Sequence, residues 1–248
     1  MTYRSSHFIL LNDTDEQWKK FGKLFPYFGV ISETKYRKNG LEDKELMEFF
    51  KTGKKQLLRA SGIIKKFLKP VFAPKKSLDF GCGVGRMLVP ISRISGSVLG
   101  VDISGGMLEE ARKNCEHRSI KNASFSLSDD ALSRVRDKFD FIFCCKVFQH
   151  IPPKRGEIIF DKLLDKLDSG GVGVFDFCYQ GAPNHTFYSQ LKMKVKSFLK
   201  NEPLMLMHNY NLNNLFGRMQ NKEIDKLYVE VFDEGHAHFC IDFFLLKK

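Results

Sequence analysis

Hydrophobic and polar positions follow different periods before and after Pro74. In residues 54–69, apolar side chains recur every three or four positions with lysines between them, a pattern that predicts an amphipathic helix. Pro70 and Pro74 end this helix and lead into a strand. The sequence therefore predicts a helical N-terminal cap or lid over residues 1–73, followed by a second unit over residues 74–248.

After Pro74, short apolar runs alternate with helical segments. The predicted strands are residues 77–80, 97–103, 123–129, 139–148 and 172–179, and a closing antiparallel hairpin is predicted over residues 226–233 and 238–246. Near-continuous apolar strands separated by helices are typical of a parallel sheet covered on both faces. We therefore expect an α/β, doubly wound, mostly parallel seven-stranded sheet, with residues 180–221 inserted as a cap segment.

The composition is that of an ordinary globular protein with a basic bias. The 248 residues are 43% hydrophobic and 28% charged, which fits one domain with an appended cap. A net charge of +11 favours an anionic ligand, an acidic partner or a membrane surface. No apolar run reaches the roughly 18 residues of a membrane-spanning helix, and the first residues turn acidic too soon for a signal peptide. Six cysteines without disulfide spacing indicate reduced thiols, so we expect a cytoplasmic protein.

A glycine-rich turn follows the first predicted strand. The dinucleotide-binding fingerprint places glycines at its first, third and sixth positions. Here Gly81, Gly83 and Gly85 occupy the first, third and fifth positions, and Arg86 occupies the sixth. Asp79 lies just before the turn, and a carboxylate there suits a cationic ligand group better than a pyrophosphate. The turn therefore indicates a cofactor site, although three glycines alone would also fit an ordinary tight turn.

From this turn onward the sequence resembles the class I S-adenosylmethionine-dependent methyltransferases. Asp102 in VDIS ends the second strand, where that family binds the ribose hydroxyls. Asp129 in LSDDA ends the third strand, where the family reads the adenine amino group. Residues 139–151 take the place of the fourth-strand motif, and residues 170–177 match the glycine-led fifth strand. The resemblance implies a Rossmann-like methyltransferase fold and S-adenosyl-L-methionine as cofactor.

The resemblance also implies which residues contact that cofactor. They are Asp79, Gly81, Cys82, Gly83, Gly85, Arg86, Asp102, Ile103, Asp129, Asp130, Cys145 and Lys146. Two assignments stay open, because Asp102 would also fit a simple helix cap and either Asp129 or Asp130 would fit the adenine contact.

Candidate catalytic residues follow the fourth strand. Methyl transfer is an in-line displacement, so positioning of the acceptor supplies much of the rate, and a hydroxyl acceptor also needs a base. His150 and Gln149 are the candidates, although His150 would equally serve by hydrogen-bonding the local backbone. Lys146 suits a structural or substrate-charge contact, because lysine stays protonated at neutral pH. The branch of this family that methylates nucleobase amines has an Asn/Asp-Pro-Pro-aromatic motif at the end of this strand. That motif is absent here, so the resemblance disfavours methylation of a nucleobase amine, and no DNA partner is expected.

Three further segments of the sequence predict a lid, the absence of a metal site and a basic helix. The aromatic segment 18–37 predicts a lid over the acceptor, with Tyr27 and Tyr36 facing it, unless these side chains are core residues of the cap. His236 and His238 lack metal-ligand spacing, and no metal is expected. Residues 190–200 predict an amphipathic helix whose lysines either face solvent or rest on an anionic membrane.

The function that these patterns favour is methyl transfer to an oxygen or nitrogen of a small or medium-sized acceptor. The basic net charge favours an anionic small molecule as that acceptor. Two alternatives stay open: methylation of RNA or another macromolecule, suggested by the net charge of +11, and binding of S-adenosylmethionine without catalysis. The acceptor and the oligomeric state are not predicted.

Overall fold

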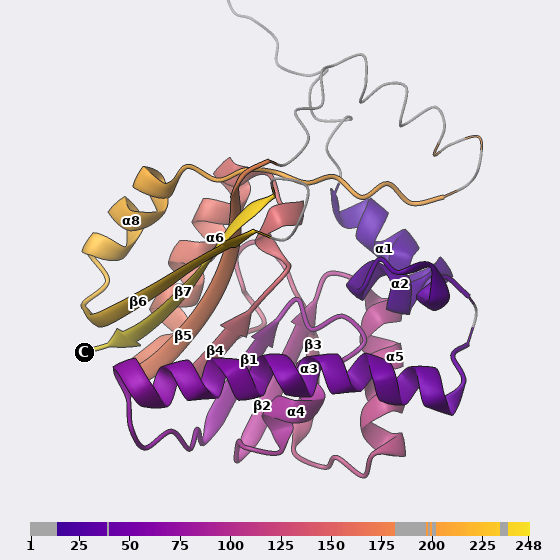
Figure 1. Ribbon diagram of the computed structural model, residues 1–248, viewed down its shortest axis with the longest axis horizontal. Coiled ribbons are helices and arrows are strands. Elements are labelled where there is room, and N and C mark those ends of the chain that lie inside the picture. The colour runs from indigo at the N-terminus through magenta and orange to yellow at the C-terminus, as the bar shows by residue number, and fades with distance from the viewer. Residues whose placement is uncertain (1–13, 39, 182–196, 198, 200–201, 234–237) are drawn as a thin grey trace, which may run out of the picture.

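The computed structural model describes residues 14–38, 40–181, 197, 199, 202–233 and 238–248. A seven-stranded sheet forms its centre, in the order β3-β2-β1-β4-β5-β7-β6 (Figure 1). The strands are β1 (Lys76–Phe80), β2 (Ser97–Asp102), β3 (Ala123–Leu127), β4 (Phe139–Cys144), β5 (Leu167–Gln180), β6 (Ile224–Asp233) and β7 (Phe239–Lys247). Strands β1 to β5 pair in parallel, and β7 pairs antiparallel with both β5 and β6. The predicted fold class and the closing hairpin are confirmed.

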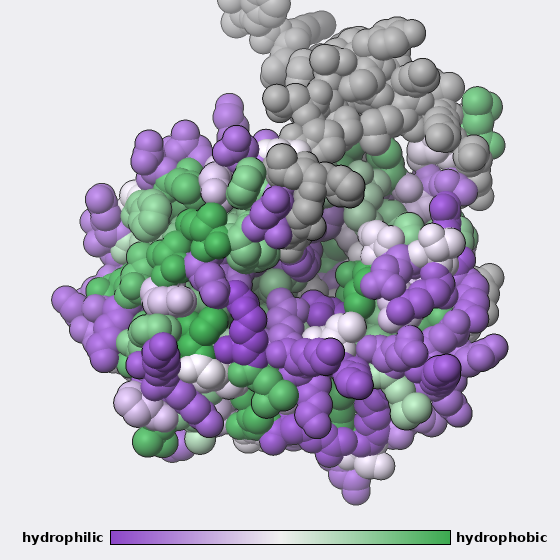
Figure 2. All heavy atoms as spheres, viewed as in Figure 1, coloured by the Kyte–Doolittle hydropathy of each residue, from purple (hydrophilic) through white to green (hydrophobic). Residues whose placement is uncertain are grey.

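Helices cover both faces of this sheet. They are α1 (Thr14–Leu24), α2 (Pro26–Val30), η2 (Thr34–Tyr36), α3 (Asp43–Ile63), η3 (Ile64–Leu68), α4 (Leu88–Ser92), α5 (Gly105–His117), η4 (Phe148–His150), α6 (Pro153–Lys166) and α8 (Leu212–Gln220). Long helix α3 crosses one face, where mainly hydrophilic side chains meet the solvent (Figures 1 and 2).

The apolar alternation of the strands builds two cores. On β4, Phe141 and Phe143 pack with α3, α4 and α5, whereas Ile142 and Cys144 pack with α6 and α8. This is the division expected when successive side chains of a strand point to opposite faces. The central strands are buried on both faces, so they read as continuous apolar runs in the sequence. The sheet is therefore a rigid platform whose strand ends carry the polar residues.

Several element boundaries differ from the prediction. Strand β4 ends at Cys144 rather than near residue 148, because Lys146 adopts a left-handed backbone (φ +62°) and residues 148–150 form a 3₁₀ turn. Helix α3 begins at Asp43, eleven residues before the predicted start, because Glu42 and Glu45 form a reciprocal capping box. The predicted helix over residues 190–200 lies outside the described residues, apart from positions 197 and 199.

The N-terminal helices pack on the sheet through α5 and α3. Phe21, Tyr27, Tyr36 and Phe49 form a third apolar cluster together with Met107 of α5. The boundary predicted at residue 73 stays a prediction. Among the described helices, none is long and apolar enough to cross a membrane.

Candidate active site

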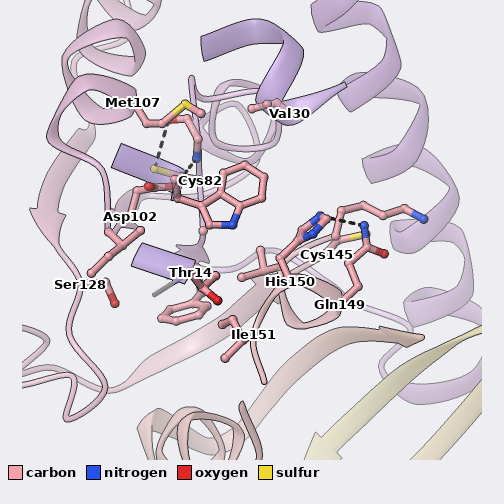
Figure 3. A pocket seen from close by; sticks show the side chains of 18 of the residues that line it. Thr14, Val30, Cys82, Asp102, Met107, Ser128, Cys145, Gln149, His150 and Ile151 are labelled. Atoms are coloured by element: carbon pink, nitrogen blue, oxygen red, sulfur yellow. Dashed lines mark hydrogen bonds between the residues drawn. The ribbon is translucent and has the colours of Figure 1, made fainter. Parts of the chain in front are cut away.

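A cavity of about 440 Å³ lies at the carboxyl ends of β1, β2 and β4. The strand order reverses direction between β1 and β4, and ligands of open α/β sheets bind at such a switch point. Figure 3 shows Asp102 and Ser128 on one side of this cavity and His150 with Gln149 on the other. The predicted cofactor residues that line it are Asp79, Gly81, Cys82, Gly83, Arg86, Asp102, Ile103, Asp129, Asp130, Cys145 and Lys146.

The glycine turn brings the backbone against the cavity. Gly81 and Gly83 have left-handed φ angles of +70° and +52°, which favour glycine. A Cβ atom on Gly81 would lie 2.3 Å from a methyl group of Val147, and one on Gly83 would lie 2.6 Å from a methyl group of Val30. Gly85 (φ +89°) does not line the cavity. A Cβ atom added to it would contact Ala111 of α5. The third glycine therefore serves the turn rather than the cavity.

Asp79 lines the cavity and has a buried carboxylate oxygen. Its side chain is 2% exposed, and Oδ2 has no hydrogen-bond partner among the described residues. Burial raises the pKa of Asp79 to about 7, while the nearby positive charge of Arg86 opposes that shift. Arg86 is itself nearly buried and donates from Nη2 to Gln56 Oε1 at 2.8 Å. An unpaired buried carboxylate that lines a cavity fits a cationic group of a ligand.

Asp102 supports the glycine turn from the end of β2. Its Oδ2 accepts a hydrogen bond from the Gly83 amide and its Oδ1 from the Ser104 amide, both at 2.9 Å. Burial raises its pKa to about 6. Ser104, and not Asp102, is the N-cap of α5, since its hydroxyl accepts from the Met107 amide. Asp102 therefore ties the glycine turn to the start of α5 and lines the cavity.

Asp129 and Asp130 have different partners. Asp129 accepts from the amide and hydroxyl of Ser133, and these hydrogen bonds lower its pKa. Asp130 accepts two bonds of 2.6 Å from the guanidinium of Arg155 on α6. Arg155 also contacts Asp15 of α1 at 2.7 and 2.8 Å. Arg155 thus joins the cavity floor to the first helix, and the assignment of the adenine contact to Asp129 stays a prediction.

The exit of β4 is held in place by a buried carboxylate. The Lys146 amide donates to Asp176 Oδ1 at 2.8 Å, and Lys146 Nζ lies 3.9 Å from Asp176 Oδ2. Asp176 on β5 is fully buried, so it stabilises the left-handed backbone at Lys146. Gln56 of α3 donates to Cys145 Sγ at 2.7 Å, and burial raises the pKa of Cys145 well above its usual value. The structural role expected for Lys146 has a concrete partner in Asp176.

His150 is buried and hydrogen-bonded at both ring nitrogens. Nδ1 lies 2.9 Å from the Leu206 carbonyl, which can only accept, so Nδ1 carries the hydrogen. Nε2 then accepts from Gln149 Nε2 at 3.0 Å (Figure 3). Burial lowers the pKa of His150 to about 4, so the ring is neutral at pH 7. Cys178 donates to Gln149 Oε1 at 3.3 Å, which fixes the amide.

The roof of the cavity comes from segments that sequence reasoning did not single out. Trp18 of α1 lies with its ring centre 4.9 Å from that of His150, and Val30 and Ile31 line the same side. Met205 and Met207 complete the roof from the far end of the chain. No local pattern marks the two methionines, whereas Trp18 lies at the start of the aromatic segment identified in the sequence.

The predicted lid residues Tyr27 and Tyr36 require a correction. Both are buried, at 4% and 1% exposure, and neither is among the residues that line the cavity. Tyr27 donates to Glu110 Oε1 and contacts Asn114 on α5, and Tyr36 packs edge-on against Phe49. They are core residues of the N-terminal helices because their ring area is needed to attach those helices to α5 and α3.

The described residues contain no group of three His, Cys, Asp or Glu side chains placed to hold a metal ion. His236 lies outside the described residues, and His238 immediately precedes β7.

Comparisons with known proteins agree with this geometry. Residues 78–171 match the family model described as a methyltransferase domain. A ubiquinone biosynthesis O-methyltransferase of Methylococcus capsulatus is 28% identical over 128 residues, which are 51% of this chain and 48% of that protein. An aklanonic acid methyltransferase of a Streptomyces species is 34% identical over 101 residues, covering 39% of this chain and 45% of that protein.

Similar solved structures cover more of the chain. The magnesium protoporphyrin IX methyltransferase of Synechocystis, crystallised with bound SAH, aligns with a TM-score of 0.62 and 16% identity over 95% of this chain and 100% of that one. At this identity the match shows the fold alone. An open, mostly parallel sheet with a glycine turn and strand-end carboxylates around one cavity defines a nucleotide-cofactor-binding α/β fold. Residues 78–171 match a methyltransferase domain, and the chain shares its fold with a methyltransferase that was crystallised with SAH.

The aligned part of the chain spans less than half the length of the curated relatives just described. A 23S rRNA (uracil-C5) methyltransferase of Marinomonas posidonica is 38% identical over 60 residues, which are 14% of that protein.

Proposed function

We propose that this protein binds S-adenosyl-L-methionine and transfers its methyl group to an oxygen or nitrogen of a small or medium-sized acceptor. The observation that carries the proposal is the buried, unpaired Oδ2 of Asp79 beside the glycine turn of a methyltransferase domain. A buried carboxylate oxygen without a hydrogen-bond partner costs stability, so its retention is understandable when a cationic ligand contacts it. The α-amino group of S-adenosylmethionine is such a cation.

The residues present fit the rest of this cofactor. Asp79 would hold the amino group, and the turn at Gly81 and Gly83 lets the ligand lie against the main chain. Asp102 has lone pairs left for the ribose hydroxyls, and Asp129 lines the cavity where the adenine amino group would bind. When bound, the cofactor supplies an electrophilic methyl group on a sulfonium. The protein's task is then to hold an acceptor atom in line with that group and to exclude water.

The acceptor would enter beside the exit of β4 and below the roof. Gln149 and His150 line this end, together with Trp18, Met205 and Met207. An apolar roof with a few polar groups below it is typical of a small-molecule site. The relatives' names also point to small acceptors, since one acts in ubiquinone biosynthesis and one on aklanonic acid. An anionic acceptor is a further part of the proposal, supported by the net charge of +11.

We assign His150 a conditional role as general base. Its Nε2 carries the lone pair that a hydroxyl acceptor would use, and Gln149 occupies that lone pair. Acceptor binding must therefore turn the Gln149 amide away before His150 can remove a proton. In that case the pH–rate profile falls on the acid side near pH 4 rather than near pH 6.5. His150→Ala would then lower turnover by about 10²–10⁴-fold, whereas unchanged turnover would leave His150 a roof support only.

The proposal is tested by calorimetry and by turnover. The full chain is titrated with S-adenosylmethionine, with S-adenosylhomocysteine and with NAD as a matched nucleotide control. Binding of the first two and not of NAD is expected; binding of NAD alone would contradict the cofactor assignment. Release of S-adenosylhomocysteine is then measured with a panel of phenols, carboxylic acids and amines and with RNA. Turnover on RNA alone would select the macromolecular alternative, and cofactor binding without turnover on any acceptor would select the non-catalytic one.

A further inference from the structure

Helix α3 and the π-helical turn η3 carry an unusual run of charge. From Lys51 to Val71 the sequence has seven basic residues and no acidic one. The apolar side of the run is buried against the sheet through Leu57, Ala60 and Ile64. The basic side faces solvent and is exposed at Lys51, Lys54, Lys55, Lys65 and Lys66. We call this exposed surface, with the apolar residues described next, the outer α3 face.

The lysines of the outer α3 face keep their charge available. None of the five forms an ion pair with a described residue, in contrast to Arg59, whose guanidinium contacts Asp242 and Glu230. Arg59 therefore pairs with Asp242 and Glu230, and the five lysines stay outside these ion pairs. In Figure 2, which has the viewing direction of Figure 1, hydrophilic side chains run along α3 and are interrupted by hydrophobic ones.

Large apolar side chains lie exposed among these lysines. Leu58 is 64% exposed, Phe67 is 41% exposed and Val71 is 78% exposed. Phe67 is held in place by stacking on Tyr228 of β6, with ring centres 4.2 Å apart and planes within 8°. Leu58 lies between Lys54 and Lys65 at helical spacing, so cationic and apolar groups share one face. Exposed apolar groups inside a cationic surface are costly in water and characterise helices that lie in a membrane interface.

We propose that the outer α3 face docks on an anionic lipid bilayer. The five lysines would bind lipid headgroups, and the side chains of Leu58, Phe67 and Val71 would enter the boundary between headgroups and acyl chains. RNA shares the attraction to lysine, but its phosphates offer no place for exposed leucine and valine. The inner side of the same helix lines the cavity through Thr52 and Gln56. Docking would thus hold one wall of the cavity close to the bilayer.

The expected effect is large enough to measure. Each lysine near an anionic surface contributes about 1 kcal/mol, which corresponds to roughly fivefold in binding. Replacing three of them should therefore weaken binding to anionic vesicles by about 100-fold. High salt should act in the same direction, because it screens charge over less than a nanometre.

The experiment uses the full chain and sedimentation with vesicles of phosphatidylcholine, with or without one-third phosphatidylglycerol. Binding is expected only to the anionic vesicles. It should be lost in the triple variant Lys54→Gln, Lys55→Gln, Lys66→Gln, and weakened without loss of charge in Leu58→Ser. The matched control replaces Lys121, Lys138 and Lys154, three exposed lysines outside α3, with glutamine and should bind as the parent does.

Four results would overturn the proposal. The first three are no binding to either kind of vesicle, equal binding to neutral and anionic vesicles, and equal losses of binding in the two triple variants. The fourth is a parent protein that binds a short RNA duplex but no vesicles, together with loss of RNA binding in the α3 triple variant and not in the control. Calorimetry with S-adenosylhomocysteine on the same variants separates this outcome from the proposed activity. Neither triple variant changes a residue of the cavity, so both should bind that ligand as the parent does.

Discussion

Replacement of Asp79 by Asn removes one charge from the floor of the cavity and keeps its shape. Asp79 is buried beside Arg86, and its Oδ2 has no hydrogen-bond partner among the described residues. A hydrogen bond to a charged group is worth about 1.5–3 kcal/mol. If the ammonium group of the cofactor binds there, Asp79→Asn should weaken S-adenosylhomocysteine binding by about 10- to 150-fold.

The pH dependence of ligand binding tests the same role of Asp79, because affinity should rise with pH. The pKa of Asp79 is raised to about 7, so the carboxyl is protonated below that pH and ionised above it. With that pKa, the ionised fraction rises from about 3% at pH 5.5 to about 90% at pH 8. A ligand cation selects the ionised form, so affinity should rise by about 30-fold across this window. Asp102, with a pKa of about 6, also titrates there, and the difference between the parent and Asp79→Asn profiles isolates Asp79.

Isothermal titration calorimetry at half-unit steps of pH measures both effects. The control is Asp137→Asn, which removes an exposed carboxylate that pairs with Lys76 at the opposite end of β1. Its affinity and its pH profile should match those of the parent. An Asp79→Asn protein with parental affinity at pH 8, or with the full parental pH profile, would refute the reasoning that Asp79 holds the cation.

Three further predictions follow from the roof, the turn and the contact at Arg155. Trp18 is the single tryptophan and lines the cavity, so S-adenosylhomocysteine should change the tryptophan fluorescence of the protein. Unchanged emission at saturating ligand would place the ligand away from Trp18. Gly83→Ala should weaken ligand binding at least tenfold by calorimetry, because φ of Gly83 is +52° and the added carbon would lie 2.6 Å from a methyl group of Val30. Unchanged affinity would mean that the turn adapts to the added carbon. Arg155→Lys should speed ligand dissociation in stopped flow, because lysine lacks the planar fork that gives Asp130 two hydrogen bonds while it also contacts Asp15. An unchanged rate would mean that this fork does not hold α1 over the bound ligand.

The raised pKa of Asp79 also predicts that the stability of the ligand-free protein falls with pH, whereas its affinity for the ligand rises. In the unfolded chain Asp79 ionises near pH 3.8, whereas in the folded protein it ionises near pH 7. Its contribution to the free energy of unfolding is therefore fully present below pH 3.8 and is lost as pH rises through 7. Chemical denaturation of the ligand-free protein between pH 5 and 8 should show a smaller fall for Asp79→Asn than for the parent. Equal falls would mean that Asp79 is not protonated in the folded protein at pH 5.

Local patterns predict the sheet well because burial acts on each strand separately. Residues 139–144 are apolar except for Asp140, because β4 is covered on both faces. The antiparallel hairpin follows from two strand-like runs, β6 and β7, that are separated by a short connection. The predicted end of β4 was wrong because residues 145–148 continue the apolar run of the strand, apart from Lys146. What ends the strand is a contact across the fold, in which Asp176 holds the Lys146 amide in a left-handed conformation.

The residues of the candidate site likewise fall into those that a local motif predicts and those that depend on tertiary packing. Asp79, Gly83 and Asp102 lie at strand ends, where a short motif carries the chemistry, and they line the cavity as expected. Aromatic composition alone did not separate Trp18, which lines the cavity, from Tyr27, which is buried against α5. That difference depends on how α1 and α2 rotate when they pack, which is a tertiary property with no local signal.

The two halves of the cavity come from different parts of the chain. The floor, from Asp79 to His150, lies within the matched methyltransferase segment, whereas Trp18 and Met205 of the roof lie before and after it. Gln17 Oε1 accepts from the Leu204 amide at 2.8 Å, so the two outer segments are joined directly to each other above the floor. Such an arrangement lets the roof diverge while the floor is retained. Exchange of the two outer segments as a pair between relatives is therefore a route by which evolution, or an engineer, would change the acceptor and leave the methyl donor the same.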